Sequence, residues 1–188
     1  MGNKSIILFI GLPYTGKTAL IRRLQQELPG RAVYADELFT RTVPPDEISL
    51  DRWLRESERL AEQIRAIVQS LDAERFYVEL GIMPAGPRRS LLRWAQAEGY
   101  RLLPLWLRCD DEAELNRRHR ARVRRVGVGG SRGATIEISL GGLYQRICAA
   151  FEEPTAEEGF IIVDTIAPLD ECVAVVRRMI AQMQRSSR

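Results

Sequence analysis

Long apolar runs, lysine, histidine and cysteine are all scarce in this chain of 188 residues. No stretch approaches the roughly 20 consecutive apolar residues that span a membrane, and the first residues lack the charged-then-apolar pattern of a secretion signal. Cys109, Cys148 and Cys172 are far apart and form no CxxC pair, which argues against a disulfide framework and against a cysteine zinc site. We therefore expect free thiols, no membrane partner and a cytoplasmic location.

The size and composition of the chain favour one well-packed domain. Hydrophobic residues make up 45% of the sequence, and a chain of this length is too short for two full domains. We expect a single domain over residues 1–188. The formal net charge is +3, which does not by itself call for a nucleic-acid partner.

One motif near the start predicts nucleotide binding. Residues 11–18 read GLPYTGKT and fit the phosphate-loop pattern of Gly, four residues and Gly-Lys-Thr. Backbone N–H groups of such a loop surround phosphates, its Lys reaches the β- and γ-phosphates, and its Thr hydroxyl binds Mg²⁺. An apolar run at 5–10 precedes the motif, as a buried parallel strand would, and apolar residues at helical spacing follow it. The predicted nucleotide-binding residues in this motif are Gly11, Pro13, Tyr14, Thr15, Gly16, Lys17, Thr18 and Ala19.

Two carboxylates follow the next two predicted strands. Asp36 comes after a strand at 32–35, and Glu79 after a strand at 76–78. Parallel sheets bind ligands at the carboxyl ends of their strands. Asp36 could accept a proton from an attacking hydroxyl or help to hold Mg²⁺, although it could also be the N-cap of the next turn. Glu79 continues an apolar strand, where a carboxylate is costly to bury without a charged partner or a metal.

The remaining pattern alternates helices with strands and predicts a three-layer α/β domain with a five-stranded parallel sheet. We expect Trp53 in the core and a loop over residues 40–48. Pro87 suits the first position of its helix, whereas Pro104 is awkward in a strand. The other predicted elements are helices at 46–71, 87 onward, 112–126, 139–151 and 169–183, and strands at 101–109 and 159–165.

Arginines occur at two places where positive charge is unfavourable unless an anion or solvent is near. Arg88 falls in the first turn of a helix, where the helix dipole disfavours cations, so it either meets an anionic substrate or is solvated at the surface. Residues 117–125 hold six arginines and no acid, and glycines follow them closely. We interpret residues 115–138 as a lid that places guanidinium groups over the nucleotide; a solvated basic face is the alternative. His119 lies among these arginines and is expected at the surface rather than as a catalytic base.

The chain resembles the small P-loop kinases of the polynucleotide-kinase/zeta-toxin type, an AAA-like ATP-binding family that neighbours shikimate, gluconate and nucleotide kinases. The resemblance rests on the phosphate loop, on residues 35–38 (ADEL), on the Arg-rich segment and on residues 151–160 (FEEPTAEEGF). It implies the strand order 2-3-1-4-5 and a role for Asp36 in activating the acceptor hydroxyl. It also implies contacts with phosphate or adenine for lid arginines, namely Arg117, Arg118, Arg122 and Arg125.

Two departures from that family concern the acceptor and the metal. Many members have Arg three residues after the aspartate, where this chain has Phe39, with Arg41 two residues further on. The third strand often ends in Asp, whereas this one offers Glu79. We therefore name Thr18 and Glu79 as metal ligands. The candidate substrate-binding residues are Asp36, Arg41, Glu79 and Arg88.

These features together predict an ATP-dependent kinase that acts on a hydroxyl, with Lys17, Asp36 and Arg122 as catalytic residues and Mg²⁺ as cofactor. ATP is preferred over GTP because one guanine-reading element needs a lysine downstream, and none follows Lys17. No aromatic residues stand among the lid arginines to stack bases, which favours a small-molecule acceptor over a polynucleotide 5′-hydroxyl. A nucleotide-binding or ATP-hydrolysing switch is the alternative from another class. The sequence leaves the oligomeric state open.

Overall fold

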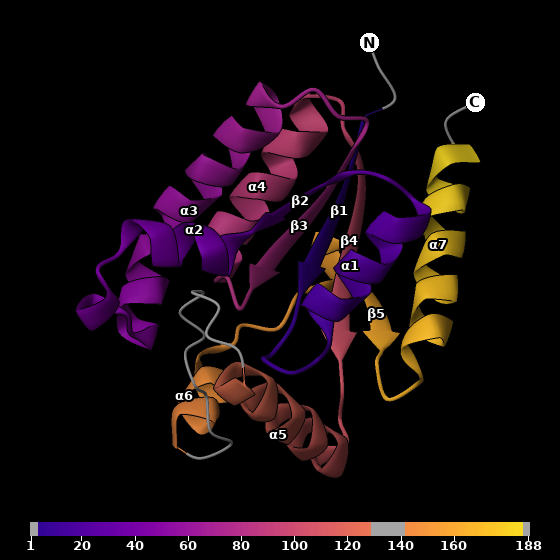
Figure 1. Cartoon of the computed structure of the whole chain (residues 1–188). Helices are drawn as coiled ribbons and strands as arrows, with labels where there is room; N and C mark the ends of the chain where they lie inside the picture. Colours follow the sequence, from indigo (N-terminus) through magenta and orange to yellow (C-terminus); the bar gives the residue numbers. More distant parts are fainter. Residues whose placement is uncertain (1–3, 129–141, 186–188) are drawn as a thin grey trace.

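The computed structural model describes residues 4–128 and 142–185, with the side chains of residues 123–128 excepted. Five parallel strands form one sheet in the order β2-β3-β1-β4-β5, which confirms the predicted fold class and strand order. The start of β1 and the end of α7 lie at one end of the sheet, opposite α5 and α6 (Figure 1). The strands are β1 Ser5–Ile10, β2 Arg31–Tyr34, β3 Arg75–Gly81, β4 Arg101–Arg108 and β5 Ile161–Asp164.

Helices cover both faces of the sheet. α1 and α7 pack on one face, while α2, α3 and α4 pack on the other (Figure 1). α5 and α6 lie beyond the carboxyl ends of the strands (Figure 1). The helices are α1 Lys17–Glu27, α2 Ala35–Thr42, α3 Leu50–Ser70, α4 Ala85–Ala97, α5 Glu112–Val128, α6 Gly142–Ala150 and α7 Leu169–Arg185, with short 3₁₀ helices η1 Pro45–Glu47 and η2 Ala156–Glu158.

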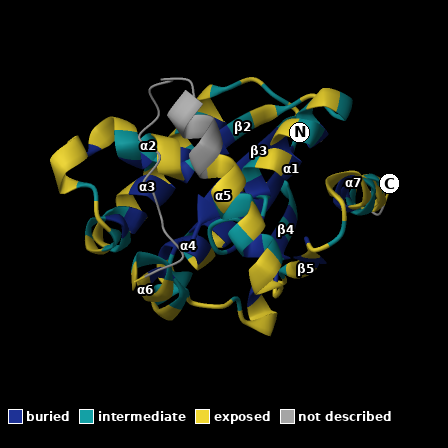
Figure 2. Cartoon of the chain, turned by 60° about the horizontal axis from the view of Figure 1, so that its bottom comes forward, coloured by how far each residue is buried: buried dark blue, intermediate teal, exposed yellow. Residues whose placement is uncertain are grey.

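The central strand β1 is buried along its whole length. Its side chains alternate between two core clusters, with Ile6 and Leu8 in the cluster under α3 and α4, and Ile7 and Phe9 in the cluster under α1 and α7. A strand buried on both faces reads as a continuous apolar run, which is why the sequence showed no alternation here. The buried strands enclosed by half-exposed helices are visible in Figure 2.

The segment after β2 differs from the prediction of a loop over residues 40–48. A helix, α2, already begins at Ala35 and runs to Thr42. Acidic residues in its first turn and Arg41 in its last turn suit the helix dipole, and Phe39 anchors it in the core at 1% exposure. This short amphipathic turn places Asp36 inside a helix rather than at an N-cap, since the N-cap residue is Tyr34.

Other boundaries shift by a few residues. The long helix begins at Leu50 because the Ser49 side chain caps it by accepting the Arg52 amide. Trp53 is in the core as predicted, at 6% exposure. Pro87 lies at the third position of α4 and not at the first. Pro104 is tolerated in β4 because the pairing with β5 starts only at Leu105.

The three cysteines are free, as expected. In the described part of the chain, no helix combines the length and apolar character that crossing a membrane requires.

Candidate functional site

The phosphate-loop motif connects β1 to α1 at the carboxyl edge of the sheet. Gly11 has φ +145°, and a Cβ there would lie 2.4 Å from the Leu107 carbonyl oxygen, so this position needs glycine. Gly16 has φ +86° and precedes the first turn of α1. Tyr14 also has a positive φ, at 67°, which is uncommon for a residue other than glycine. The loop therefore has the tight, backbone-lined conformation that the motif predicts.

Lys17 is buried under this loop. Its Nζ donates to the carbonyls of Gly11 and Leu12 at 2.8 and 2.9 Å, and it lies 3.9 Å from Glu79 Oε1. Burial lowers the pKa of Lys17, while the charges of Glu79 and Asp36 act in the opposite direction. A phosphate in the loop would offer this ammonium a charged acceptor, which forms stronger hydrogen bonds than neutral carbonyls do.

Glu79 meets the phosphate loop from the neighbouring strand. Its Oε2 accepts a hydrogen bond of 2.9 Å from the Thr18 hydroxyl, and the residue is only 6% exposed. Burial raises the pKa of Glu79, against the opposing charge of Lys17. The two residues predicted as metal ligands thus contact each other directly.

The donor set of this contact fits Mg²⁺. One hydroxyl and one carboxylate are hard oxygen ligands, and Mg²⁺ binds through one or two protein oxygens while it keeps waters and substrate phosphates. Within residues 4–128 and 142–185, no three His, Cys, Asp or Glu side chains gather into a metal cage. Thr18 and Glu79 offer two oxygen ligands, and nucleotide phosphates and waters would supply the others.

Asp36 stands beside the same charges. Its Oδ1 would lie 3.5 Å from a Cβ on Gly81, a residue with φ +59° that also faces Trp53. Burial raises the pKa of Asp36, and the charges of Lys17 and Arg122 oppose that rise. The residue as a whole is nevertheless exposed to solvent. The structure thus brings the proposed base to the phosphate loop.

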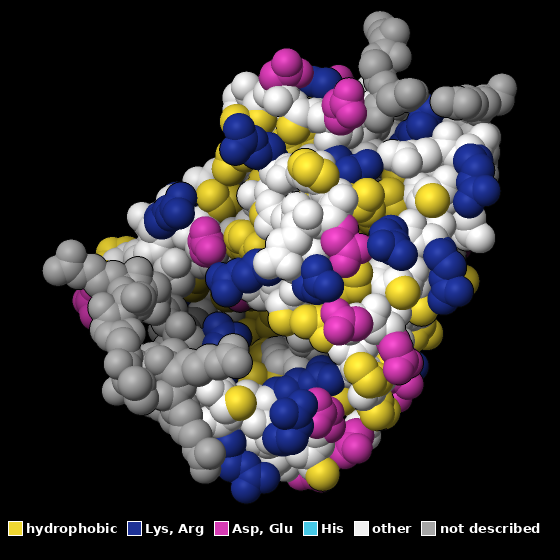
Figure 3. Space-filling model, turned by 45° about the vertical axis from the view of Figure 1, so that its right-hand side comes forward, with side chains coloured by type: hydrophobic (Ala, Val, Ile, Leu, Met, Phe, Trp, Pro, Cys, Tyr) yellow, Lys and Arg dark blue, Asp and Glu magenta, His cyan; other side chains and the backbone are white. Residues whose placement is uncertain are grey.

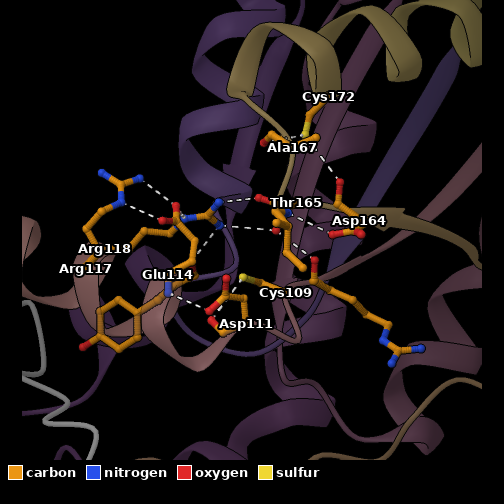
Figure 4. A network of polar contacts seen from close by, with 12 residues as sticks. Cys109, Asp111, Glu114, Arg117, Arg118, Asp164, Thr165, Ala167 and Cys172 are labelled. Atoms are coloured by element: carbon orange, nitrogen blue, oxygen red, sulfur yellow. Dashed lines mark hydrogen bonds and ion pairs between the residues drawn. The ribbon is translucent and has the colours of Figure 1, made fainter.

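The arginines of α5 have three different environments. Arg118 reaches the phosphate loop, where its Nη1 donates to the Tyr14 carbonyl at 3.3 Å, and its guanidinium also donates to Thr165 after β5 (Figure 4). Arg117 is 69% exposed and pairs with Glu114. Arg122 is exposed, yet its charge acts on Lys17 and Asp36. Two of the predicted arginines therefore face the loop and one faces solvent.

Glu114 supplies the carboxylate that the arginine run needs. Hydrogen bonds from Arg117 and Arg118 hold its pKa down at about 2. The Arg125 side chain and residues 129–138 of the predicted lid lie outside the described residues, so that part of the prediction stays untested.

The single histidine, His119, is partly exposed. His119 packs edge-on against the Tyr14 ring, with ring centroids 5.1 Å apart, and Tyr144 of α6 lies 6.3 Å from the same ring. The Tyr14 side chain thus connects the phosphate loop to both α5 and α6.

Two predicted substrate residues lie elsewhere. Arg41 is 74% exposed and pairs with Glu37 one turn earlier; its contact with an acceptor stays a prediction. Arg88 has no exposed side chain and forms a bidentate ion pair with Glu158. Its anion is a carboxylate inside the protein, so the structure contradicts a substrate-binding role for Arg88.

Sequence reasoning missed Thr165 and Gly81. Thr165 is buried at 5% exposure, accepts from Arg118 and donates to the Arg108 carbonyl. It directly follows β5, and the rule that singled out Asp36 and Glu79 would have found it. Gly81 has no comparable signal, because its role depends on a backbone angle and on neighbours distant in sequence.

Comparisons with known proteins agree with this geometry. A family model described as an AAA domain matches residues 6–132. No curated protein sequence matches the chain. Among solved structures, a gluconokinase from Sinorhizobium meliloti 1021 is 19% identical, with full coverage of both chains and a TM-score of 0.55.

Two further structures contain bound nucleotides or their analogues. The APS kinase of Mycobacterium tuberculosis, in complex with AMPPNP and APS, is 14% identical over 96% of this chain and 99% of that chain, with a TM-score of 0.62. Kti12 of Chaetomium thermophilum, in complex with ADP-AlF3, is 15% identical over 94% of this chain and 97% of that chain, with a TM-score of 0.64. At these identities the likeness shows the fold alone, an α/β fold of the P-loop NTPase type. Since the family model covers more than half of the sequence, the chain belongs to the AAA domain family.

Proposed function

We propose that the protein is an ATP-dependent kinase that transfers the γ-phosphoryl group of ATP to a hydroxyl of a small molecule. The observation that carries the proposal is the meeting of Asp36 with Lys17 and with the Thr18–Glu79 pair at one edge of the sheet. Nucleotide binding alone does not require a second carboxylate next to the phosphate loop. A kinase does, because the acceptor hydroxyl must be oriented and must lose its proton.

Each residue has a role that follows from its position. The loop amides and Lys17 bind the phosphates of ATP, and Thr18 and Glu79 would hold Mg²⁺, which neutralises phosphate charge when bound. Asp36 accepts the proton of the acceptor hydroxyl as its oxygen attacks the γ-phosphorus. The bond from that phosphorus to the bridging oxygen breaks, and ADP leaves with the electron pair.

The positive charge of α5 supports the same reaction. The charge of Arg122 acts on Lys17, Asp36 and Glu79. A guanidinium there stabilises the charge that develops on the transferring group. Basic side chains also border the hollow that is visible in the lower half of Figure 3. Kinases and a Kti12 protein bound to nucleotide analogues share this fold, which is consistent with the proposal.

The test uses γ-labelled ATP and Mg²⁺ with two acceptor pools, a metabolite extract and oligonucleotides with free 5′-hydroxyls. Label should appear in the metabolite pool and disappear in Lys17→Ala and Asp36→Asn, whereas the exposed Arg93→Gln on α4 should behave as wild type. Label in the oligonucleotides would instead make the acceptor a polynucleotide. Label only in free phosphate, unchanged in Asp36→Asn, would refute the kinase and support a hydrolysing switch. Competition by unlabelled GTP as strong as that by ATP would refute the preference for ATP.

A further inference from the structure

The segment of residues 152–160, called the strap below, is the one family-like motif to which the proposed function gives no role. It connects α6 to β5 and includes η2. Glu158, in its centre, is 7% exposed and lies against Arg88, which has no exposed surface. The two side chains form a fork, with Nε to Oε2 at 2.5 Å and Nη2 to Oε1 at 2.9 Å.

Arg88 holds two backbone segments in addition to Glu158. Its Nη1 donates to the Met83 carbonyl at 2.9 Å and to the Glu152 carbonyl at 3.0 Å. Four of its five N–H groups are thus used inside the protein, and its guanidinium lies 5.8 Å from the centre of the Phe160 ring. One side chain therefore connects the loop after β3 to both ends of the strap.

The strap contributes bonds of its own to the same loop. Glu152 accepts the Ala85 amide at 2.8 Å through its side chain. Thr155 and Glu158 form a reciprocal capping box around η2. Burial acts to raise the pKa of Glu158, but hydrogen bonds from Arg88 and the Thr155 amide bring that pKa below its ordinary value. The carboxylate is thus held ionised in the interior.

The two parts that this cluster joins belong to different sides of the proposed site. The loop at 82–84 directly follows Gly81, the last residue of β3, which lies two residues after Glu79 and faces Asp36. The strap begins two residues after α6, whose Tyr144 lies near the phosphate-loop residue Tyr14. A buried ion pair gives little net stability compared with apolar residues of similar volume. Its donors to backbone carbonyls, in contrast, fix position in a way that apolar residues cannot.

We propose that Arg88 and Glu158 are positioning residues. Through the strap, they fix the loop that follows Glu79 relative to the C-terminal end of α6. This link keeps Glu79 in contact with Thr18 while ligands enter the site from the side of α5 and α6. Its consequence for Mg²⁺ binding rests on the proposed function, whereas the mechanical link between the two segments does not.

The decisive variant is the pair Arg88→Met/Glu158→Leu, because it keeps a filled, uncharged interior and removes the hydrogen bonds to Met83 and Glu152. Amide hydrogen exchange should then rise at least tenfold in residues 81–85 and in α6 together, with a thermal midpoint near that of wild type. Arg93→Gln on the exposed face of α4 is the control and should change neither segment. Exchange within twofold of wild type in either segment, or a uniform rise over the whole chain, would overturn the proposal.

Two additions keep the result decisive. If the double variant does not fold, Arg88→Lys retains the buried charge but loses the fork, and it should show the same paired rise in exchange. The second readout is AMPPNP affinity with and without Mg²⁺. The gain in affinity from Mg²⁺ should fall at least threefold in these variants, while the affinity without Mg²⁺ stays within twofold. An undiminished gain from Mg²⁺ would overturn the positioning of Glu79. A wild-type protein that gains nothing from Mg²⁺ would instead refute the proposed metal role, and the exchange data would still decide the link.

Discussion

Replacing Gly11 with alanine tests whether the phosphate loop depends on the contact between its first residue and β4. The new Cβ would lie 2.4 Å from the Leu107 carbonyl oxygen and 3.1 Å from Thr15 Oγ1. Leu107 is fully buried and pairs with Val163 of β5, so its backbone has little room to retreat. The loop must therefore move away from the position that the motif requires.

The size of the effect follows from two costs. Overpacking of a well-packed interior costs about 1–3 kcal/mol, and a non-glycine residue held at a strained φ costs roughly 1–3 kcal/mol more. A chain of this size loses about 2–4 °C of thermal midpoint per kcal/mol. We therefore expect Gly11→Ala to melt roughly 5–20 °C below wild type.

Gly30→Ala provides a matched control at the opposite edge of the sheet. A Cβ on Gly30 would lie 2.8 Å from both the Arg75 carbonyl oxygen and the Tyr77 ring, so this variant should also be destabilised. Gly30 precedes β2, whereas the phosphate loop follows β1. Only Gly11→Ala should therefore lose nucleotide binding.

The assay is thermal unfolding with and without AMPPNP and Mg²⁺. A ligand at 100 times its dissociation constant stabilises by about 2.7 kcal/mol, which corresponds to roughly 5–10 °C here. Wild type and Gly30→Ala should both show this gain, and Gly11→Ala should not. A Gly11→Ala protein that retains the full gain, or melts within about 2 °C of wild type, would show that the loop tolerates the displacement and that our reasoning is wrong.

Three further predictions concern the charged side chains of the site and of the strap. Glu79→Gln should remove most of the stabilisation that Mg²⁺ adds to bound AMPPNP, measured by titration calorimetry; an unchanged Mg²⁺ effect would assign the metal elsewhere. The pKa values of Asp36 and Glu79 are raised. The rate of phosphotransfer should therefore fall as the pH drops through a range above the ordinary carboxyl pKa of about 4. A rate that stays unchanged down to pH 4 would contradict the role of Asp36 as base. The pKa of Glu158 is lowered in the folded state, so its contribution to stability is present above the unfolded value of about 4.3 and is lost as the pH falls through the folded value. Arg88→Met leaves that carboxylate buried with the more exposed Arg89, 3.5 Å away, as its remaining ionic partner. The variant should cost up to about 3–5 kcal/mol in urea unfolding at pH 7, a loss that must shrink on acidification if the poorly paired charge is its cause.

The sequence predicted the parts of the site whose signals are local. The phosphate loop has a fixed spacing, and Asp36 and Glu79 each follow an apolar strand, where the topology of a parallel sheet brings ligand-binding residues together. Their mutual approach through Thr18 and Lys17 follows from that topology alone. The strand order also came with the family resemblance.

The errors arose where distant residues decide the outcome. α2 was missed because it has only eight residues and follows β2 without a break, and Phe39 stabilises it through core contacts. Arg88 was assigned to an external anion because the dipole argument was sound but its partner, Glu158, lies 70 residues away. Neither the core contacts of Phe39 nor the pairing of Arg88 with Glu158 could be found from local periodicity or spacing.

The arginines of α5 also show that distant residues decide the outcome, here for single side chains. Arg117 and Arg118 are neighbours in sequence, yet a rotation of about 100° per residue sends their side chains to different surroundings. Arg118 meets the backbone of Tyr14 and Thr165, while Arg117 meets only Glu114 and solvent. Composition indicates that such a segment needs anions, but only the packing of α5 against the phosphate loop determines which guanidinium faces a ligand.

The charges at the carboxyl edge also explain why this site should respond strongly to nucleotide. Lys17 and Glu79 are both buried. Burial lowers the pKa of Lys17 and raises that of Glu79, and each shift favours the neutral form. Lys17 uses uncharged carbonyls as acceptors, and Glu79 lies 3.9 Å from it without a closer ionic contact. A bound phosphate would supply negative charge to Lys17, and Mg²⁺ would supply positive charge to Glu79. Either ligand would lower the cost of keeping a buried side chain charged, so binding of nucleotide with Mg²⁺ should stabilise the fold more than binding of nucleotide alone.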